Sequence, residues 1–437
     1  MPIKTKLELQ WKILIGITAG ILLGIIFNKA FGQEIQYGPV IILKLFFKYG
    51  GDIFIRLLWM LIIPLVFASI FMAILNMGDI RKIGRIGGVT IVYYLVTTGL
   101  AVLIGLILVN FTHPGRGVEK KAFQDLKTNT SISKQVSKGG LGEKSNTIII
   151  TETLVNMIPK NPIGAMARGD ILQVIFFTIF FAVAAAIVGK ESEPLTGVIN
   201  ALDHIMQRAV SIIMIIAPYC IFLLVTSIFM DIGVQALATL IKYALTVLLG
   251  LLIHAGITLP LLVLFIGRYN PIKLAKALSP AILTAWSTAS SAATLPLTMH
   301  CLSKRAGVDH RIGNFVLPLG ATINMDGTAL YESVAAIFIA ELMGINLTIG
   351  TQLVIFITAT LAAIGAAAIP GAGLVTMGIV LTAAGLPLEG IGLILAVDRI
   401  LDQFRTAVNV WGDATAGVVV GRLGKIDLID NKGGTYK

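Results

Sequence analysis

Charged residues are scarce in this chain. Only 13% of its 437 residues are Asp, Glu, Lys or Arg, whereas 56% are hydrophobic and the mean hydropathy is +0.89. A soluble protein of this length needs a far more polar surface. Apolar runs of the roughly 20 residues that cross a bilayer recur along the chain, and the alternating pattern of membrane β-barrels is missing. The composition therefore predicts an all-α polytopic membrane protein in the lipid bilayer.

Cysteine is nearly absent, since Cys220 and Cys301 are the only two, and both lie in or beside apolar segments. Two distant cysteines make no disulfide framework, so we interpret them as small buried hydrophobic residues. A net charge of +11 indicates basic loops beside an anionic membrane surface and no nucleic-acid partner. The first apolar run, residues 11–27, lacks a small-residue cleavage site and predicts a helix rather than a signal peptide.

Further apolar stretches predict helices at residues 39–77, 86–111, 171–188, 205–230 and 236–266. The last three carry almost no charge, which is typical of a scaffold. Residues 113–168 form the one long polar tract and predict an extramembrane loop. In the third helix, Tyr94, Thr97 and Thr98 share a face. Their spacing alone favours hydrogen bonding between helices.

Two later segments each interrupt a hydrophobic stretch with small residues and a proline. They are residues 285–296 (AWSTASSAATLP, with Pro296) and 362–373 (AAIGAAAIPGAG, with Pro370). Such a pair in corresponding places indicates inverted repeats and a transporter binding site. Each segment predicts a re-entrant helical hairpin whose tip is buried in protein or lines a water-filled cavity. The alternative is two ordinary spans with flexible kinks.

Between these segments, residues 324–328 (NMDGT) contain four poor helix formers. An unwound helix here would present carbonyl, amide and carboxylate oxygens, including those of Asp326, to a hard cation such as Na⁺. The alternative is an unbroken helix with Asp326 in a salt bridge, for which Arg405 is the main cation available. Glu332 lies roughly 240° round the helix from Asp326, and a lone membrane glutamate is a candidate proton carrier.

Residues 398–413 (DRILDQFRTAVNVWGD) are polar on one face only. At about 100° per residue, that face carries Asp398, Asp402, Arg405, Thr406, Asn409 and Asp413. The stripe must face protein or water, because lipid offers no hydrogen-bond partners. With Asp326 and Glu332, five acids face one arginine, an excess of four negative charges, or three if Arg399 turns inward. Such a cluster is unstable without cations or protons. We therefore expect bound cations and an anionic substrate whose carboxylate meets the Arg405 guanidinium.

Four motifs in this order resemble the dicarboxylate/amino acid:cation symporters, most closely the glutamate/aspartate transporters, which include the excitatory amino acid transporters of animals. They are Ser290-Ser291, NMDGTALYE at 324–332, IPGAG at 369–373, and DxxRTxxNxxGD at 402–413. The resemblance implies a multi-pass plasma-membrane protein that is no enzyme. It would couple the symport of L-glutamate or L-aspartate to Na⁺.

The implied architecture is eight transmembrane helices plus two re-entrant hairpins in a homotrimer with an elevator-type mechanism. Scaffold helices 1 and 2 would occupy residues 1–80, and transport-domain helix 3 residues 81–112. The extramembrane loop and scaffold helices 4 and 5 would occupy residues 113–232. The remaining transport domain would occupy 233–425 and a C-terminal tail 426–437.

The resemblance also assigns binding residues. The substrate pocket would comprise Ser290, Ser291, Thr328, Ile369, Gly373, Asp402, Arg405, Thr406 and Asn409, with Arg405 on the side-chain carboxylate and Asp402 on the α-amino group. Sodium sites are implied at Gly320, Asn324, Asn409 and Asp413; at Thr322, Ala363 and Ile364; and at Tyr94, Thr97, Thr98, Asn324 and Asp326. Glu332 matches the animal members, which implies coupling to H⁺ and counter-transport of K⁺. The chain departs from the family at three positions: many microbial members have arginine in place of Ala289, the family has serine in place of Ala292, and animal members have arginine in place of Gln403.

Three alternatives stay open. A C4-dicarboxylate symporter of the same fold is disfavoured by Asp402, because a carboxylate there repels a substrate that lacks an amine. An intramembrane aspartyl protease needs two acids that share a proton at about 3 Å, an arrangement that Arg405 and Asn409 spoil. A pure ion channel is the third, since an anion leak accompanies this family.

Overall fold

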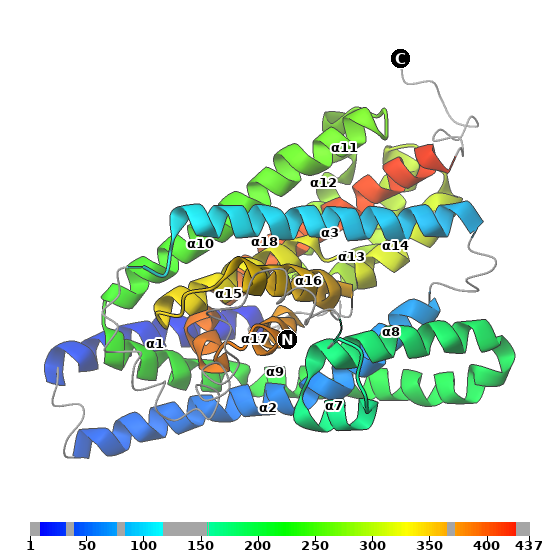
Figure 1. Ribbon diagram of the computed structural model, residues 1–437. Helices are drawn as coiled ribbons and strands as arrows, with labels where there is room; N and C mark the ends of the chain where they lie inside the picture. The colour runs from blue at the N-terminus through cyan, green and yellow to red at the C-terminus, as the bar shows by residue number, and fades with distance from the viewer. Residues whose placement is uncertain are drawn as a thin grey trace, which may run out of the picture.

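The computed structural model describes residues 9–31, 39–76, 84–116, 155, 157–364 and 372–424. Every regular element among these residues is a helix (Figure 1). The all-α class predicted from the composition is therefore confirmed for this part of the chain. Most of the tract expected as a loop at 113–168, and the whole tail expected at 426–437, lie outside the described residues.

The first half of the chain contains α1 (Leu9–Phe31), α2 (Pro39–Asn76), α3 (Gly84–Thr112), α7 (Pro162–Arg168), α8 (Ile171–Val188), the short turn η2 (Gly189–Ser192) and α9 (Glu193–Ile232). The predicted helices match α1, α2, α3 and α8 within a few residues. α9 begins well before the predicted residue 205, because Pro194 lies in its first turn, where the missing N–H is not needed. The added turns include Asp203, which accepts a hydrogen bond from Ser69 of α2 (2.6 Å).

The second half is made of shorter helices. It contains α10 (Gln235–Ile253), the π-helix η3 (His254–Thr258), α11 (Leu259–Phe265), α12 (Pro271–Thr288), α13 (Ser291–His300), η4 (Cys301–Arg305), α14 (His310–Ile323), α15 (Asp326–Leu342), α16 (Ile349–Ile364), α17 (Ala372–Ala383), η5 (Leu388–Gly390) and α18 (Ile391–Leu423). α12 packs against α13 and α16 packs against α17, so each segment expected as a hairpin is a pair of contacting helices.

The helices fall into two groups that lie side by side (Figure 1). In one group, α1 and α2 pack along α9, and α2 also packs on α8. In the other, α3 packs on α15, and α18 contacts α10, α12, α14 and α15. α17 contacts α2 and α8, while α18 contacts α9, so the second hairpin and the last helix connect the two groups.

Helix α1 approaches α9 through a row of glycines. A Cβ added at Gly16 would lie 2.6 Å from the Pro218 carbonyl oxygen, and one added at Gly20 would lie 2.9 Å from that of Phe222. Small residues four apart allow helix backbones to come close in a membrane, where van der Waals packing drives association. These glycines therefore fix α1 tightly on α9.

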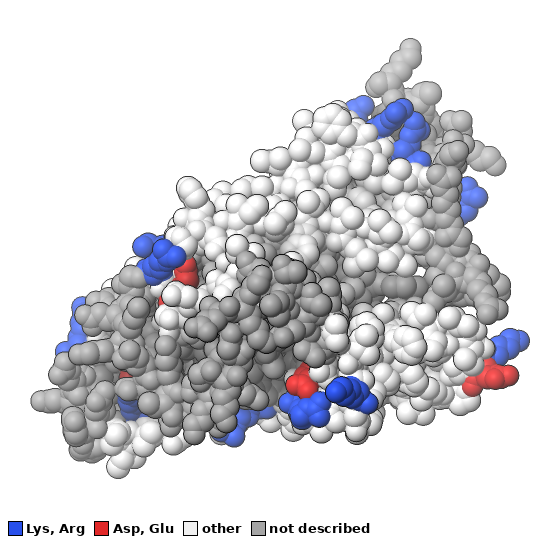
Figure 2. Space-filling view, in the orientation of Figure 1, with Lys and Arg blue, Asp and Glu red and all other residues white. Residues whose placement is uncertain are grey.

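Five described stretches are long and apolar enough to cross a membrane. They are Trp11–Phe31, Ile41–Leu75, Ile86–Thr112, Leu172–Asp231, which spans nearly all of α8 and α9, and Leu237–Phe265. On the face shown in Figure 2, the described charged side chains lie in small groups toward the margins, and the white atoms between these groups belong to uncharged residues. The chain is therefore a multi-pass membrane protein. The count of eight spans stays a prediction, because α15 and α18 carry the polar residues of the candidate site.

Candidate functional site

The helix expected to unwind between the two hairpins is interrupted. α14 ends at Ile323 and α15 begins at Asp326. Asn324 (φ −97°, ψ 87°) and Met325 (φ −116°, ψ 56°) have non-helical backbone between them. Asn324, Met325 and Asp326 are all buried. The alternative of an unbroken helix is therefore wrong, and two helix termini, whose end groups have no partner within their own helix, meet inside the molecule.

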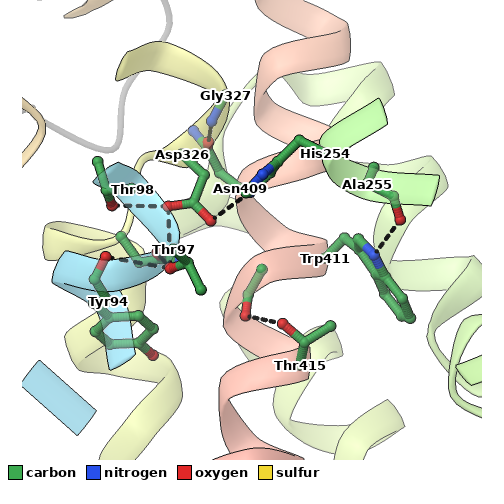
Figure 3. Close-up of polar contacts among 12 residues, drawn as sticks. Tyr94, Thr97, Thr98, His254, Ala255, Asp326, Gly327, Asn409, Trp411 and Thr415 are labelled. Atoms are coloured by element: carbon green, nitrogen blue, oxygen red, sulfur yellow. Dashed lines mark hydrogen bonds and ion pairs between the residues drawn. The ribbon is translucent and has the colours of Figure 1, made fainter. Parts of the chain in front are cut away.

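Asp326 lies between α3 and the π-helix η3 (Figure 3). Its Oδ1 accepts a hydrogen bond from Thr98 Oγ1 at 2.8 Å and lies 3.4 Å from Thr97 Oγ1. Thr97 Oγ1 is also 3.4 Å from Asn324 Oδ1 and 3.2 Å from the Tyr94 carbonyl oxygen. The structure thus brings together the third implied sodium group, which the spacing of the hydroxyls alone did not require.

His254 belongs to the same cluster and was missed in the sequence. Its Nε2 lies 2.9 Å from Asp326 Oδ2, and both side chains are fully buried. Single-turn π-helices frequently occur at functional sites, and η3 also leaves the Ala255 carbonyl free to accept from Trp411 Nε1 (3.1 Å). Residues 236–266, interpreted as scaffold because they carry almost no charge, therefore contribute a buried ionisable side chain to the candidate site. The available signal was a histidine within an apolar span.

The Asp413 carboxylate forms the centre of a second group. Asn324 Nδ2 donates to Asp413 Oδ1 at 2.9 Å. Gly320 lies against the same carboxylate, because a Cβ built there would overlap Asp413 Oδ1 and the Tyr94 hydroxyl group. Asn409 joins from α18, and its Oδ1 accepts from the Gly327 N–H at 2.8 Å. The first implied sodium group is therefore assembled from α14, α18 and the break between α14 and α15, around buried oxygen atoms.

The remaining implied sodium group is less fully assembled. Thr322 is half-buried, and its hydroxyl group donates within its own helix to the Leu319 carbonyl (2.9 Å). Ala363 and Ile364 form the last residues of α16, which contacts α14. The next seven residues of the hairpin, 365–371, lie outside the described residues.

Arg405 is the most completely buried charged side chain of α18, with no exposed surface. Its Nη2 lies 3.0 Å from Asp398 Oδ1 and 2.9 Å from Asp402 Oδ1. Its guanidinium carbon stands 3.7 Å from the centre of the Tyr331 ring, and the Tyr331 hydroxyl donates to Asp398 Oδ1 at 2.6 Å. The Nε and Nη1 atoms of Arg405 are buried without a hydrogen-bond partner among the described residues. The guanidinium group is thus held in place through Nη2, while the N–H groups of Nε and Nη1 remain available as hydrogen-bond donors.

Arg399 also turns toward this cluster, and its Nη1 lies 3.3 Å from Asp402 Oδ2. Two arginines therefore balance Asp398 and Asp402, and the excess negative charge belongs to Asp326, Asp413 and Glu332. All six residues of the predicted polar stripe are buried, so the expectation that it faces protein is confirmed. The site consists of a balanced arginine–aspartate cluster and separate acidic groups beside the interrupted helix.

The first hairpin turns at Ala289 and Ser290. Ala289 has left-handed backbone (φ 49°), and the Ser290 Oγ accepts from the Ala293 N–H at 3.2 Å, which caps α13. Ser291 follows as a buried residue. Pro296, which together with small residues marked this interruption in the sequence, lies within α13. The left-handed residue, rather than the proline, ends α12.

The second hairpin reaches Arg405 through Gly373. A Cβ built on Gly373 would lie 3.2 Å from Arg405 Nη1. Ile369 and Pro370, in the turn itself, lie outside the described residues. Thr406 donates to the Asp402 carbonyl (2.8 Å), and the Asn409 amide nitrogen is 3.4 Å from Thr328 Oγ1. The structure thus places Asp402 and Gly373 at the Arg405 guanidinium group and Asn409 beside Thr328.

Glu332 lies one helical turn beyond Thr328 and is fully buried. Neither carboxyl oxygen has a well-formed hydrogen bond among the described residues, and the Thr376 hydroxyl is its polar neighbour. It shares no contact with Asp326, as the predicted angle between them requires. Glu332 is therefore separate from both candidate cation groups.

Comparison with known proteins identifies the family of this chain. Residues 9–423 match the family model described as the sodium:dicarboxylate symporter family. Excitatory amino acid transporter 2 of Rattus norvegicus is 37% identical, over 94% of this chain and 79% of its own length. Excitatory amino acid transporter 3 of Mus musculus is 36% identical, over 95% and 86%. An excitatory amino acid transporter of Caenorhabditis elegans is 35% identical, over 88% and 82%. The chain therefore belongs to the sodium:dicarboxylate symporter family.

Proposed function

We propose that this protein is a sodium-coupled secondary symporter that carries L-aspartate and L-glutamate across the plasma membrane. The arrangement of Arg405 beside Asp402 is the observation that supports this substrate class best. Arg405 offers buried N–H donors to a carboxylate, and Asp402 offers a carboxylate to an ammonium group. A substrate that carries both charges a few ångströms apart satisfies both residues at once.

In this proposal the side-chain carboxylate of the substrate binds the Nε and Nη1 edge of Arg405. The α-amino group binds Asp402, and Thr328, Thr406 and Asn409 supply the remaining polar contacts. The hairpin tips, with Ser290 and Ser291 on one and Ile369 and Gly373 on the other, cover the substrate from both sides. Expulsion of water by these tips strengthens every charge interaction in the pocket.

Sodium coupling follows from the acidic groups beside the interrupted helix. Asp326 with Thr97, Thr98 and Asn324, and Asp413 with Gly320 and Asn409, present the hard oxygen ligands that Na⁺ prefers. Asn409 hydrogen-bonds the Gly327 N–H and lies one helical turn from Arg405. We infer that cations bound at these groups neutralise buried carboxylates and fix the position of Thr328 and Asn409 for the substrate.

The two helix groups support an elevator model. α1, α2, α8 and α9 would form a static scaffold, and α3 with α10–α18, including both inverted-repeat hairpins, a moving transport domain. Contacts of α17 with α2 and α8 would then lie on the sliding surface. A homotrimer is the assembly that the family resemblance implies. Glu332 is the proposed H⁺ carrier and, by the same resemblance, the residue that links transport to K⁺.

A C4-dicarboxylate symporter of the same fold is the second candidate function. It is favoured by the contact of Arg399 with Asp402, which reduces the repulsion that Asp402 would exert on a substrate without an amine. An aspartyl protease is disfavoured, because Arg405 lies between the carboxylates of Asp398 and Asp402.

Uptake by purified protein in liposomes tests the proposal. Na⁺, H⁺ and K⁺ gradients are imposed singly, and accumulation of labelled L-aspartate, L-glutamate and succinate is followed. We expect aspartate and glutamate to accumulate only with an inward Na⁺ gradient, and inward H⁺ and outward K⁺ gradients to increase accumulation. Equal uptake of succinate and aspartate would favour the C4-dicarboxylate symporter. Uptake that does not depend on the Na⁺ gradient would refute both candidate functions.

A further inference from the structure

The Asp402 carboxylate lies between two guanidinium groups, one on each oxygen. Arg405 Nη2 is 2.9 Å from Oδ1, and Arg399 Nη1 is 3.3 Å from Oδ2. All three residues belong to α18. Any ammonium group that binds Asp402 must therefore share this carboxylate with two arginines or displace one of them.

The two arginines differ in how firmly they are held. The Arg405 side chain has no exposed surface, contacts Asp398 as well as Asp402, and stacks on Tyr331. The Arg399 side chain is 12% exposed, and its contact with Asp402 is the longer of the two. Arg399 precedes Asp402 by about one helical turn, so a change of its rotamer releases the carboxylate without movement of the backbone. We therefore expect the Arg399 side chain, rather than that of Arg405, to move away from the Asp402 carboxylate when an ammonium group binds there.

The charge of the substrate determines whether Arg399 has to leave the Asp402 carboxylate. An acidic amino acid brings its own ammonium group to Asp402, which makes Arg399 a competitor for that carboxylate. A C4-dicarboxylate brings two negative charges and no cation. Asp402 then stays neutralised only if Arg399 remains on it, because an uncompensated buried charge is strongly unfavourable.

We propose that Arg399 determines how strictly the site requires an amino group. Its guanidinium group gives up Asp402 to an amino-acid substrate and keeps Asp402 neutralised beneath a dicarboxylate. This inference depends on the proposed function, because it assigns Asp402 to the substrate amine. Arg399 thereby broadens the range of substrates, and its removal narrows that range to substrates that carry an amine.

The test compares wild type, Arg399→Gln and Arg399→Lys as full-length protein in liposomes. KM and maximal rate for Na⁺-driven L-aspartate uptake and the inhibition constant of succinate are measured for each. Arg422→Gln is the matched control, because Arg422 is an exposed arginine in the last turn of the same helix. In Arg399→Gln we expect the ratio of the succinate inhibition constant to the aspartate KM to rise about tenfold or more, as for loss of a charged hydrogen bond. Arg399→Lys should stay near the wild-type ratio, and Arg422→Gln should equal it.

A purely structural role of Arg399 predicts a lower maximal rate and melting temperature with an unchanged ratio, and that result overturns the inference. An equal rise of the aspartate KM and the succinate inhibition constant in Arg399→Gln also overturns the inference, because Arg399 would then attract both anions from a distance. Failure of Arg399→Lys to restore the ratio has the same consequence. If wild type shows Na⁺-driven aspartate uptake and Arg399→Gln has the same ratio as wild type, this inference alone is refuted. If wild type shows no Na⁺-driven aspartate uptake, the proposed function and this inference are refuted together.

Discussion

Replacement of Arg405 by cysteine is the most direct test of the substrate assignment. The guanidinium group is fully buried and contacts Asp398 at 3.0 Å, Asp402 at 2.9 Å and the Tyr331 ring at 3.7 Å. Its removal leaves two buried carboxylates without their main counter-ion. Breaking one side of a buried ion pair costs about 3–5 kcal/mol, so we expect Arg405→Cys to lower the stability of the purified protein by an amount of this order.

The effect on substrate binding is larger for acidic than for neutral amino acids. Truncation of a buried hydrogen-bonded charge weakens binding of its partner by about 2–5 kcal/mol, which is roughly 30-fold to several thousand-fold in affinity. A neutral amino acid has no side-chain carboxylate to lose this contact, and its amino group still meets Asp402. Arg405→Cys should therefore abolish uptake of L-aspartate and L-glutamate at micromolar concentration while it permits uptake of L-serine or L-cysteine.

Uptake of labelled aspartate and serine into liposomes, measured side by side, checks this expectation. Arg405→Lys is the matched control, because it keeps the charge and loses the planar fork, so acidic substrates should bind weakly rather than not at all. The double variant Arg405→Cys with Asp398→Asn removes one unpaired carboxylate and should recover part of the lost melting temperature. Unchanged aspartate uptake by Arg405→Cys would refute the role of Arg405.

Three further variants test the coupling residues. Asp326→Asn removes a buried charge from the cation group and should raise the Na⁺ concentration for half-maximal uptake at least about tenfold, whereas an unaltered Na⁺ titration would contradict its role. Glu332→Gln keeps the size of the side chain and cannot exchange a proton, so uptake should become independent of pH, and a retained pH profile would place the proton elsewhere. Gly320→Ala places a Cβ against the Asp413 carboxylate and the Tyr94 hydroxyl, so it should weaken Na⁺ affinity with little change in aspartate affinity at saturating Na⁺, and equal loss of both would argue for misfolding.

The sequence alone determined the helical membrane class and the position of the candidate site along the chain. Long apolar runs have no other stable form in a bilayer, where every backbone polar group must be satisfied internally. The polar stripe from Asp398 to Asp413 was predicted for the same reason, because its periodicity places six polar residues on one face that lipid cannot accommodate. The break at Asn324 and Met325 was predicted because four of the five residues at 324–328 have poor helix propensity.

Only the tertiary structure decided which residues from distant helices meet. His254 stands 72 positions before Asp326 in the sequence, and no periodic pattern connects a lone histidine on one helix with a carboxylate on another. The same limit applies to Tyr331 beneath Arg405 and to Arg399 on Asp402, because rotamers and helix packing, rather than spacing, select these contacts. The turn of the first hairpin was likewise decided by the left-handed backbone of Ala289, a single position that the segment pattern at 285–296 did not distinguish. Local patterns determine which side chains must avoid lipid, whereas the pairing that satisfies them depends on the packing of helices far apart in the chain.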